Sequence, residues 1–175
     1  MVHYRRNFLP GASYFLRIAL LSRTSSLLLD HITVLRDAFR AVRTQRSFVL
    51  GAVVVLPEHL HCIWTLPSGD ADYPGRCRAI KTRFSRQIPH GEWRCTSRVK
   101  KGGRGIWQRR CWEHTLRDDR DRTRHVDYIH FNPVKHGHVS RIVEWPYSSF
   151  HQFVRQGIYP VDWRGGEARG GGFGE

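Results

Sequence analysis

The sequence predicts an α+β protein with a ferredoxin-like, split βαβ fold, in which an antiparallel sheet of four to five strands is followed by an additional C-terminal helix. Two observations support this fold class. The periodic segments follow the order strand, helix, strand, strand, helix, strand, helix. The length of 175 residues suits one domain that buries a core without disulfides. We expect that domain to span residues 1–164, followed by a Gly-rich, disordered tail over residues 165–175.

The first half of the chain contains three predicted strands and one predicted helix. Aromatic and branched residues predict the first strand over residues 14–21. Apolar residues recur at helical spacing over residues 27–43 and indicate an amphipathic helix with a basic outer face. Residues 47–56 and 59–66 predict two further strands, close enough in sequence to form a hairpin.

The second half adds two helices and a fourth strand. An apolar stripe predicts a helix over residues 73–88, and a loop rich in Gly, Lys and Arg follows over residues 89–105. Residues 106–116 predict the next strand. The third helix is expected over residues 118–132, because Pro133 disfavours normal continuation.

The chain is strongly basic. Lys and Arg total 29 against 15 acidic residues, a formal charge of +14, and aromatic residues are interleaved with the basic ones. Such a chain favours a polyanionic partner, and nucleic acid above a membrane surface, because no predicted helix opposes a basic face to a broad apolar one. A generically basic protein is the alternative. No apolar run approaches membrane-spanning length, so we expect no membrane partner, and we expect no small-molecule substrate.

The cysteines and the N-terminus indicate a cytoplasmic protein. The four cysteines are widely spaced without a Cys-x-x-Cys pair, which disfavours a zinc ribbon and favours reduced thiols. Arg5 and Arg6 faintly resemble a twin-arginine export signal. Pro10, Gly11 and Arg17 interrupt the apolar region that such a signal needs, so we do not expect export.

Two histidines begin the third predicted strand. Side chains alternate between the faces of a strand, so His59 and His61 point the same way while Leu60 and Cys62 point the other way. Neutral imidazoles one strand repeat apart can both reach a single cation. Two half-buried strand histidines are the alternative, and for an isolated His-x-His pattern they are the commoner outcome.

The third predicted helix presents a phenol and an amide together. Tyr128 and Asn132 are four residues apart and share one helix face, whereas Val126 and Ile129 mark a different, core-directed face. If the first face packs over the start of the third strand, Asn132 can complete a metal site with the histidine pair. The Tyr128 hydroxyl would then lie beside it and could attack a phosphorus atom. A packed aromatic residue is the alternative for Tyr128.

Both segments resemble motifs of one enzyme superfamily. Residues 56–64 (LPEHLHCIW) resemble the His-hydrophobic-His (HUH) motif of single-tyrosine transposases, and residues 126–137 (VDYIHFNPVKHG) resemble their nucleophile helix. Further segments resemble the subgroup called REP-associated tyrosine transposases, namely Tyr4-Arg5-Arg6, Pro10-Gly11, Trp107-Gln108-Arg109-Arg110, Trp112-Glu113-His114 and Trp145-Pro146-Tyr147-Ser148-Ser149-Phe150. The similarity spans nearly all of residues 4–163.

The resemblance implies an enzyme that cleaves and rejoins single-stranded DNA at repetitive extragenic palindromes, which fold as hairpins. It implies a covalent link between Tyr128 and the 5′ phosphate, with His59, His61 and Asn132 as ligands of Mg²⁺ or Mn²⁺. Two imidazoles by themselves favour manganese or zinc over magnesium. A catalytically silent protein that binds DNA or RNA hairpins is the alternative. Some relatives are dimers that share active sites and others need not be, so a monomer and a homodimer are both alternatives for this protein.

Basic and aromatic residues are the candidate DNA contacts, and they are Arg5, Arg6, Arg83, Arg86, Lys100, Lys101, Arg104, Trp107, Arg109 and Arg110. Arg109 and Arg110 lie between Trp107 and Trp112, an arrangement that suggests base stacking beside phosphate contacts. Core tryptophans are an equal alternative. The other histidines of the C-terminal half are candidates for ligands or proton shuttles, but each is more simply structural or solvated, so none is assigned a role.

Overall fold

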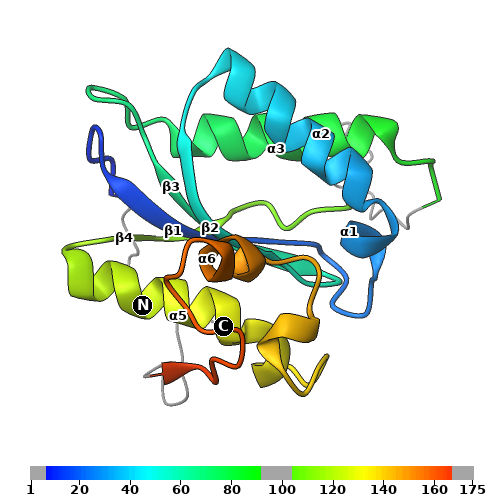
Figure 1. Cartoon of the computed structure of the whole chain (residues 1–175). Coiled ribbons are helices and arrows are strands. Elements are labelled where there is room, and N and C mark those ends of the chain that lie inside the picture. The colour runs from blue at the N-terminus through cyan, green and yellow to red at the C-terminus, as the bar shows by residue number, and fades with distance from the viewer. Residues whose placement is uncertain (1–6, 92–103, 167–175) are drawn as a thin grey trace, which may run out of the picture.

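A four-stranded antiparallel sheet forms the centre of the molecule (Figure 1). The computed structural model describes residues 7–91 and 104–166. Its strands are β1 (Ser13–Ala19), β2 (Val49–Val55), β3 (His59–Thr65) and β4 (Trp112–Thr115). They lie in the order β2-β3-β1-β4, with β3 antiparallel to both of its neighbours. This order is that of the split βαβ fold, so the predicted fold class is confirmed.

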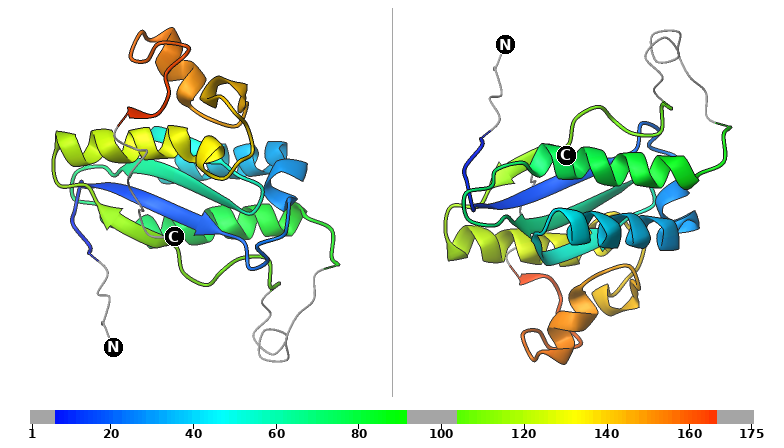
Figure 2. Two further views of the ribbon diagram at one scale, coloured as in Figure 1. Left: turned by 90° about the horizontal axis from the view of Figure 1, so that it is seen from below. Right: turned by 90° about the horizontal axis from the view of Figure 1, so that it is seen from above.

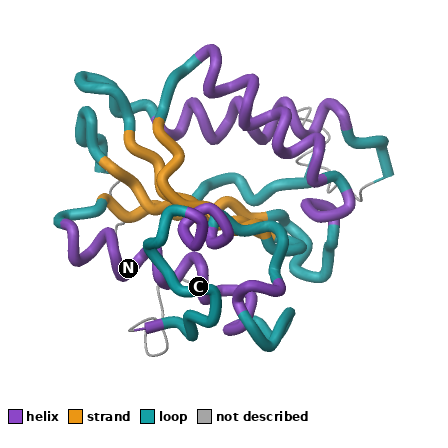
Figure 3. The backbone as a smooth tube through the Cα atoms, viewed as in Figure 1, coloured by secondary structure: helices purple, strands orange, loops and turns teal. Residues whose placement is uncertain are grey.

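Helices cover both faces of the sheet. They are α1 (Leu27–Asp30), α2 (Ile32–Gln45), α3 (Tyr73–Gln87), α5 (Asp119–Lys135), the 3₁₀ helix η1 (Ile142–Glu144) and α6 (Phe150–Arg155). Figure 2 shows α2 and α3 side by side over one face, whereas α5 lies over the other. Figure 3 shows the strands as the layer between them. Within the two described ranges, no helix is both long enough and apolar enough to cross a membrane.

Alternation along β1 and β3 divides the core into two clusters. On the face towards α2 and α3 the sheet contributes Tyr14, Leu16, Ile18, Leu60, Cys62 and Trp64. On the face towards α5 it contributes Phe15, Ala52, Val54 and Ile63, which pack with Val126, Tyr128 and Ile129. Since β3 is buried on both faces, the alternation directs His59 and His61 towards α5.

Three predictions of element bounds are wrong. The single helix predicted over residues 27–43 is divided at His31 into α1 and α2. The strand predicted over residues 106–116 is confined to β4. Trp107 packs in the core with its ring 5.3 Å from the Phe84 ring, and it forms an isolated bridge with Leu20, just after β1. The helix predicted to end near Asn132 continues through Pro133 to Lys135. Proline in the last turn removes a single N–H donor there, and His136 N–H still donates to the Asn132 carbonyl at 3.0 Å.

His130 joins α5 to the C-terminal segment. Its ring lies 4.7 Å from the Phe153 ring and 5.5 Å from the Tyr159 ring. Its Nε2 hydrogen-bonds the Ser149 hydroxyl at 2.9 Å, and the Ser149 amide donates to the Val53 carbonyl at 2.8 Å. These bonds tie α5, α6 and β2 together around a fully buried imidazole.

We expect the metal-free protein to lose stability as the pH falls below about 6.5. Burial, and next the nearby His151, lower the pKa of His130 to about 3. In the unfolded chain this imidazole takes up a proton near pH 6.5, whereas in the folded protein it stays neutral down to about pH 3. Lowering the pH between these two values therefore favours unfolding. Between pH 6.5 and 5 this residue should lower the free energy of unfolding by about 2 kcal/mol.

Urea titrations in EDTA at these two pH values measure the effect, and His130→Gln isolates the contribution of this residue. The variant should lose less stability than the wild type over the same interval. Equal losses in the two proteins would contradict the assignment to His130.

Candidate metal centre and nucleophile

The histidine pair is held at the start of β3, an interior strand of the sheet. His59 and His61 are 2% and 0% exposed, and their ring centroids are 4.9 Å apart at an angle of 88°. Backbone pairing fixes both positions, with His61 opposite Arg17 of β1 and Val54 of β2. The two imidazoles therefore project together from a backbone bonded on both sides.

Helix α5 carries Tyr128 over this pair. The Asp118 side chain caps the helix by accepting from the Asp121 amide at 2.7 Å, and Lys135 lies in its last turn. The Tyr128 ring centroid lies 5.4 Å from that of His61 and 6.0 Å from that of Phe15. The approach of this helix to the start of the third strand, which was the condition for the predicted site, is thus present.

Asn132 lies along α5 between two residues that are close to the histidine pair. Tyr128 is one helical turn before it, and His136, whose ring is 5.5 Å from the His59 ring, is one turn after it. The amide of Asn132 is fully buried. Val126 and Ile129, which were predicted to face the core, are buried, and they belong to the same core cluster as Tyr128.

Several buried polar atoms at this position have no hydrogen-bond partner among the described residues. They are His59 Nε2, both ring nitrogens of His61, and Oδ1 and Nδ2 of Asn132. Such groups are nearly always bonded in folded proteins, and each costs about 1–3 kcal/mol when it is not. Two imidazole nitrogens and an amide oxygen are ligands for a divalent cation, so these residues fit a metal ion.

Glu58 orients one of the candidate ligands. A carboxylate can only accept, so the His59 Nδ1–H donates to Glu58 Oε1, at 2.8 Å. The lone pair of His59 is then on Nε2, the atom without a partner. Metal-ligating histidines are commonly oriented by a carboxylate in this way.

The surroundings keep both imidazoles neutral. Burial lowers the pKa of His59 to about 4, with Arg17 and His136 lowering it further and Glu58 opposing them. Burial also holds the pKa of His61 well below its usual value, with the neighbouring His59 the next cause. Neutral imidazole is the form that binds a metal, so the pair is ready to bind one at pH 7.

A lysine lies against the phenol. The Lys135 Nζ is 4.9 Å from the centroid of the Tyr128 ring. Because Lys135 comes from the last turn of α5, the same helix supplies both the phenol and this cation. The positive charge favours negative charge developing on the phenol oxygen.

Comparisons with known proteins identify the family. A protein of Escherichia coli (strain K12) named REP-associated tyrosine transposase is 44% identical over 165 residues, which cover 94% of this chain and 92% of that protein. The chain belongs to the REP-associated tyrosine transposase family. A relative from Haemophilus influenzae (strain ATCC 51907 / DSM 11121 / KW20 / Rd) with the same family name is 46% identical over 167 residues, 94% of each chain.

The fold agrees with this assignment. A solved structure of a REP-associated tyrosine transposase bound to a REP hairpin superposes with a TM-score of 0.83 at 42% identity, and covers 99% of this chain and 96% of that one. No protein-family model matches the sequence. Tyrosine transposases are enzymes, so this family member is an enzyme, as the resemblance of its motifs predicted.

A second group of possible ligands in this transposase was missed by the sequence analysis. Asp121 Oδ2 lies 2.8 Å from His114 Nε2, and Asp121 Oδ1 lies 3.1 Å from His125 Nδ1. Their ligand atoms all lie within 4.8 Å of one another, so the group could hold a metal ion. Helical spacing already placed Asp121 beside His125, but the approach of His114 depends on how β4 packs against α5.

The two groups differ in how well their polar atoms are satisfied. The carboxylate of Asp121 already hydrogen-bonds His114, and the Arg117 amide donates to it at 3.1 Å. His59, His61 and Asn132 instead contain buried polar atoms without partners in the described chain. The HUH histidines and Asn132 are therefore the stronger candidates for a resident metal.

The candidate DNA contacts of the transposase are scattered. Arg83 donates to Gln45 Oε1 at 2.9 Å, and Arg86, Arg109 and Arg110 are exposed. Arg104 donates to the carbonyls of Ser85, Ile88 and Pro89 and so closes the C-terminal end of α3. Arg5, Arg6, Lys100 and Lys101 lie outside the described residues.

The position of Trp107 favours the core alternative. Its ring is 8% exposed and lies 5.3 Å from that of Phe84. Its Nε1–H donates to the Ser85 hydroxyl at 3.1 Å. A ring held in this way presents little surface on which a base could stack.

The predicted tail begins against α5. Gly165 is buried, and a Cβ at this position would lie 2.5 Å from the Phe131 ring. Its φ is +101°, a value that glycine adopts without strain. Residues 167–175 of that tail lie outside the described residues.

Proposed function

We propose that this transposase cleaves and rejoins single-stranded DNA at hairpins formed by repetitive extragenic palindromes, with Tyr128 as its nucleophile. The observation that carries this proposal is that the Tyr128 ring lies 5.4 Å from the His61 ring, beside two buried histidines. Three of their four ring nitrogens have no hydrogen-bond partner among the described residues. Family membership supports the reaction class, and a solved relative is described as bound to a REP hairpin. The basic charge of +14 suits a DNA substrate.

His59, His61 and Asn132 would hold the divalent cation, Mg²⁺ or Mn²⁺. When bound, such an ion supplies Lewis-acid polarisation of a phosphate oxygen and lowers the cost of charge on the reacting phosphate. The protein contributes the ligand geometry through β3 and α5, and Glu58 fixes the orientation of His59.

Tyr128 carries out the covalent step. Its hydroxyl oxygen attacks the phosphorus, the bond from phosphorus to the 3′ oxygen breaks, and the 5′ phosphate becomes attached to tyrosine. The phenol loses a proton and the departing 3′ oxygen gains one. Since one phosphate ester replaces another, a 3′ hydroxyl can later reverse the step without ATP.

Access to Tyr128 requires movement. Its side chain is fully buried, and its ring packs between Phe15, His61 and Lys135. A phosphate can reach the hydroxyl only when the groups that cover it are displaced. DNA binding is the event that would supply the energy for this displacement.

Covalent capture tests the proposed function. The wild-type protein is incubated with Mn²⁺ and a single-stranded DNA that contains a palindromic hairpin and carries a label on each side of the expected cleavage position. After denaturation, the label on the 5′-phosphate side should stay with the protein, and peptide mapping should place it on Tyr128. Noncovalent binding alone, or attachment at another residue, would overturn the proposal.

Cleavage should be faster in Mn²⁺ than in Mg²⁺ at equal concentration. Two imidazole ligands suit manganese better than magnesium, which prefers oxygen ligands. EDTA should remove cleavage in both cases. Single-turnover rates with each ion measure the preference, and unchanged cleavage in EDTA would contradict a metal centre.

A further inference from the structure

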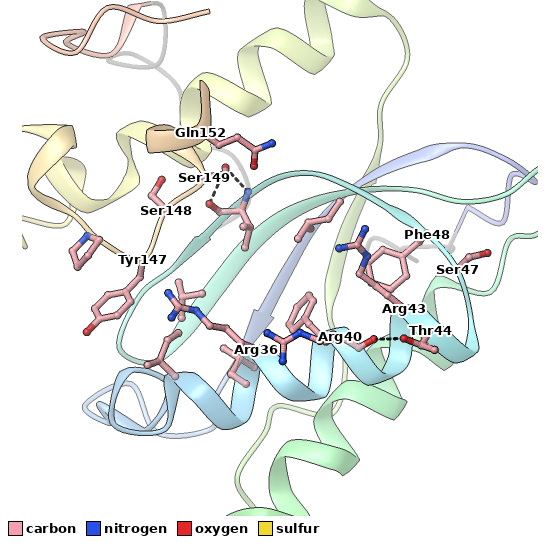
Figure 4. Close-up of a pocket in the computed structure, with 17 residues that line it drawn as sticks. Arg36, Arg40, Arg43, Thr44, Ser47, Phe48, Tyr147, Ser148, Ser149 and Gln152 are labelled. Atoms are coloured by element: carbon pink, nitrogen blue, oxygen red, sulfur yellow. Dashed lines mark hydrogen bonds between the residues drawn. The ribbon is translucent and has the colours of Figure 1, made fainter. Parts of the chain in front are cut away.

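A basic groove lies between α2 and residues 146–152, above the edge strand β2 (Figure 4). Its volume is about 660 Å³. Arg36, Arg40 and Arg43 of α2 form one wall, and Tyr147 and Gln152 lie on the other side. None of these residues was among the predicted DNA contacts.

The arginines repeat along one helix face. Arg36, Arg40 and Arg43 are spaced by four and three residues, so all three side chains lie along the groove. At 1.5 Å per residue they span about 10 Å, the length of about three stacked nucleotides at 3.4 Å each. The described residues that line the groove include no acidic side chain, although Arg40 also pairs with the exposed Asp37 outside it.

The floor and the far wall suit bases. Leu50, Val53 and Val55 of β2 make the floor apolar. Phe48 is buried against Trp64, and its ring lies 5.8 Å from the Arg43 guanidinium, so it supports that arginine rather than a base. The half-buried Tyr147 is the ring against which a base can lie. A basic wall beside an aromatic ring is an arrangement with which proteins bind unpaired nucleic acid.

The groove is connected to the candidate metal centre by a row of rings. Tyr147 is 5.6 Å from Trp145, and Trp145 is 5.2 Å from His138, between ring centroids. His138 is 6.2 Å from His136, which is 5.5 Å from His59. The Tyr147 end of the groove is therefore the end nearer the histidine pair.

We propose that this groove binds the unpaired DNA next to the hairpin and leads that strand towards Tyr128. Arg36, Arg40 and Arg43 contact successive phosphates, while bases lie against Tyr147 and the apolar floor. The inference rests on the proposed function, because it takes single-stranded DNA as the substrate. It adds a binding site that neither sequence motif contains.

Fluorescence anisotropy with two DNAs tests the groove. One DNA is a hairpin with a single-stranded flank, and the other is the same hairpin without a flank. An Arg36→Gln/Arg40→Gln/Arg43→Gln variant should bind the flanked DNA about 10- to 100-fold more weakly and the blunt hairpin within two-fold of wild type. For the flanked DNA, the plot of log binding constant against log salt concentration should be shallower by about 2. Each of the three lost phosphate contacts removes about 0.7 from its slope.

A matched variant controls for the loss of charge. Arg23, Arg120 and Arg155 are exposed and lie away from the groove, so their replacement by glutamine removes the same three charges. This control should retain the preference of the wild type for the flanked DNA. An equal loss in both variants, or an equal loss on both DNAs, would overturn the groove proposal.

Photo-crosslinking of the wild-type protein needs no variant and so covers the case in which the triple variant does not fold. Bromodeoxyuridine in the flank should crosslink to residues 146–152 or to α2, and crosslinks confined to other segments would overturn the proposal. A flanked RNA of the same sequence that binds as tightly as DNA and crosslinks at the same residues would also overturn the assignment to DNA. Covalent capture by the wild type is measured separately. Failure of the proposed cleavage and failure of the proposed groove binding can therefore be distinguished.

Discussion

Replacing Tyr128 with phenylalanine should abolish the covalent adduct and leave hairpin binding within two-fold of wild type. The substitution removes only the hydroxyl, and the ring can keep its packing against Phe15 and His61. Loss of a nucleophile from a covalent mechanism leaves no alternative route for the same step, so the single-turnover rate should fall by at least about 10⁴-fold. Denaturing gels with labelled hairpin DNA measure the adduct, and anisotropy measures binding.

Tyr14→Phe is the matched control. Tyr14 is also fully buried, but it packs on the face of the sheet towards α2 and α3, and its hydroxyl donates to the Leu9 carbonyl at 2.8 Å. Its removal should cost some stability and leave adduct formation intact. A Tyr128→Phe protein that still forms the adduct would show that another residue attacks the phosphate.

Replacing His61 with leucine should remove cleavage and, at the same time, stabilise the metal-free protein. Both ring nitrogens of His61 are buried without a partner among the described residues. An apolar side chain of similar size avoids that cost, so the free energy of unfolding in EDTA should rise by about 1–3 kcal/mol. Urea titrations of wild type and variant in EDTA measure this difference.

Leu60→Ala is the comparison for this stability effect. Leu60 is equally buried on the other face of β3, and its truncation should lower the free energy of unfolding by about 2–5 kcal/mol. Added Mn²⁺ should raise the melting temperature of the wild type but not that of His61→Leu. Destabilisation of the metal-free protein by His61→Leu would show that the imidazole is satisfied without a metal.

The sequence contained enough to predict the topology and the shared direction of the two histidines. Both depend on local periodicity: the order of strand and helix segments, and the two-residue repeat that separates His59 and His61 from Leu60. The four-residue spacing of Tyr128 and Asn132 similarly placed them along one side of a helix. That α5 covers the histidines was a condition of the prediction, and the structure meets it.

Features that depend on packing between distant segments were not predictable in this way. His114 meets Asp121 only because β4 packs near the start of α5, and the basic groove exists only because residues 146–152 return to β2. Its neighbouring arginines made Trp107 a candidate for a DNA contact, whereas the structure buries it in the core. In each case the deciding contact joins parts of the chain that share no local pattern.

The location of the histidines on an interior strand also bears on how the enzyme can move. β3 is hydrogen-bonded to β1 and β2, whereas α5 is joined to the sheet largely through side chains. Tyr128, Asn132 and Lys135 belong to one continuous helix, so a shift of α5 that exposes the nucleophile also displaces the amide and the lysine. Binding of the metal ion and placement of the nucleophile would therefore be coupled, because both depend on the position of α5 relative to a sheet that stays in place.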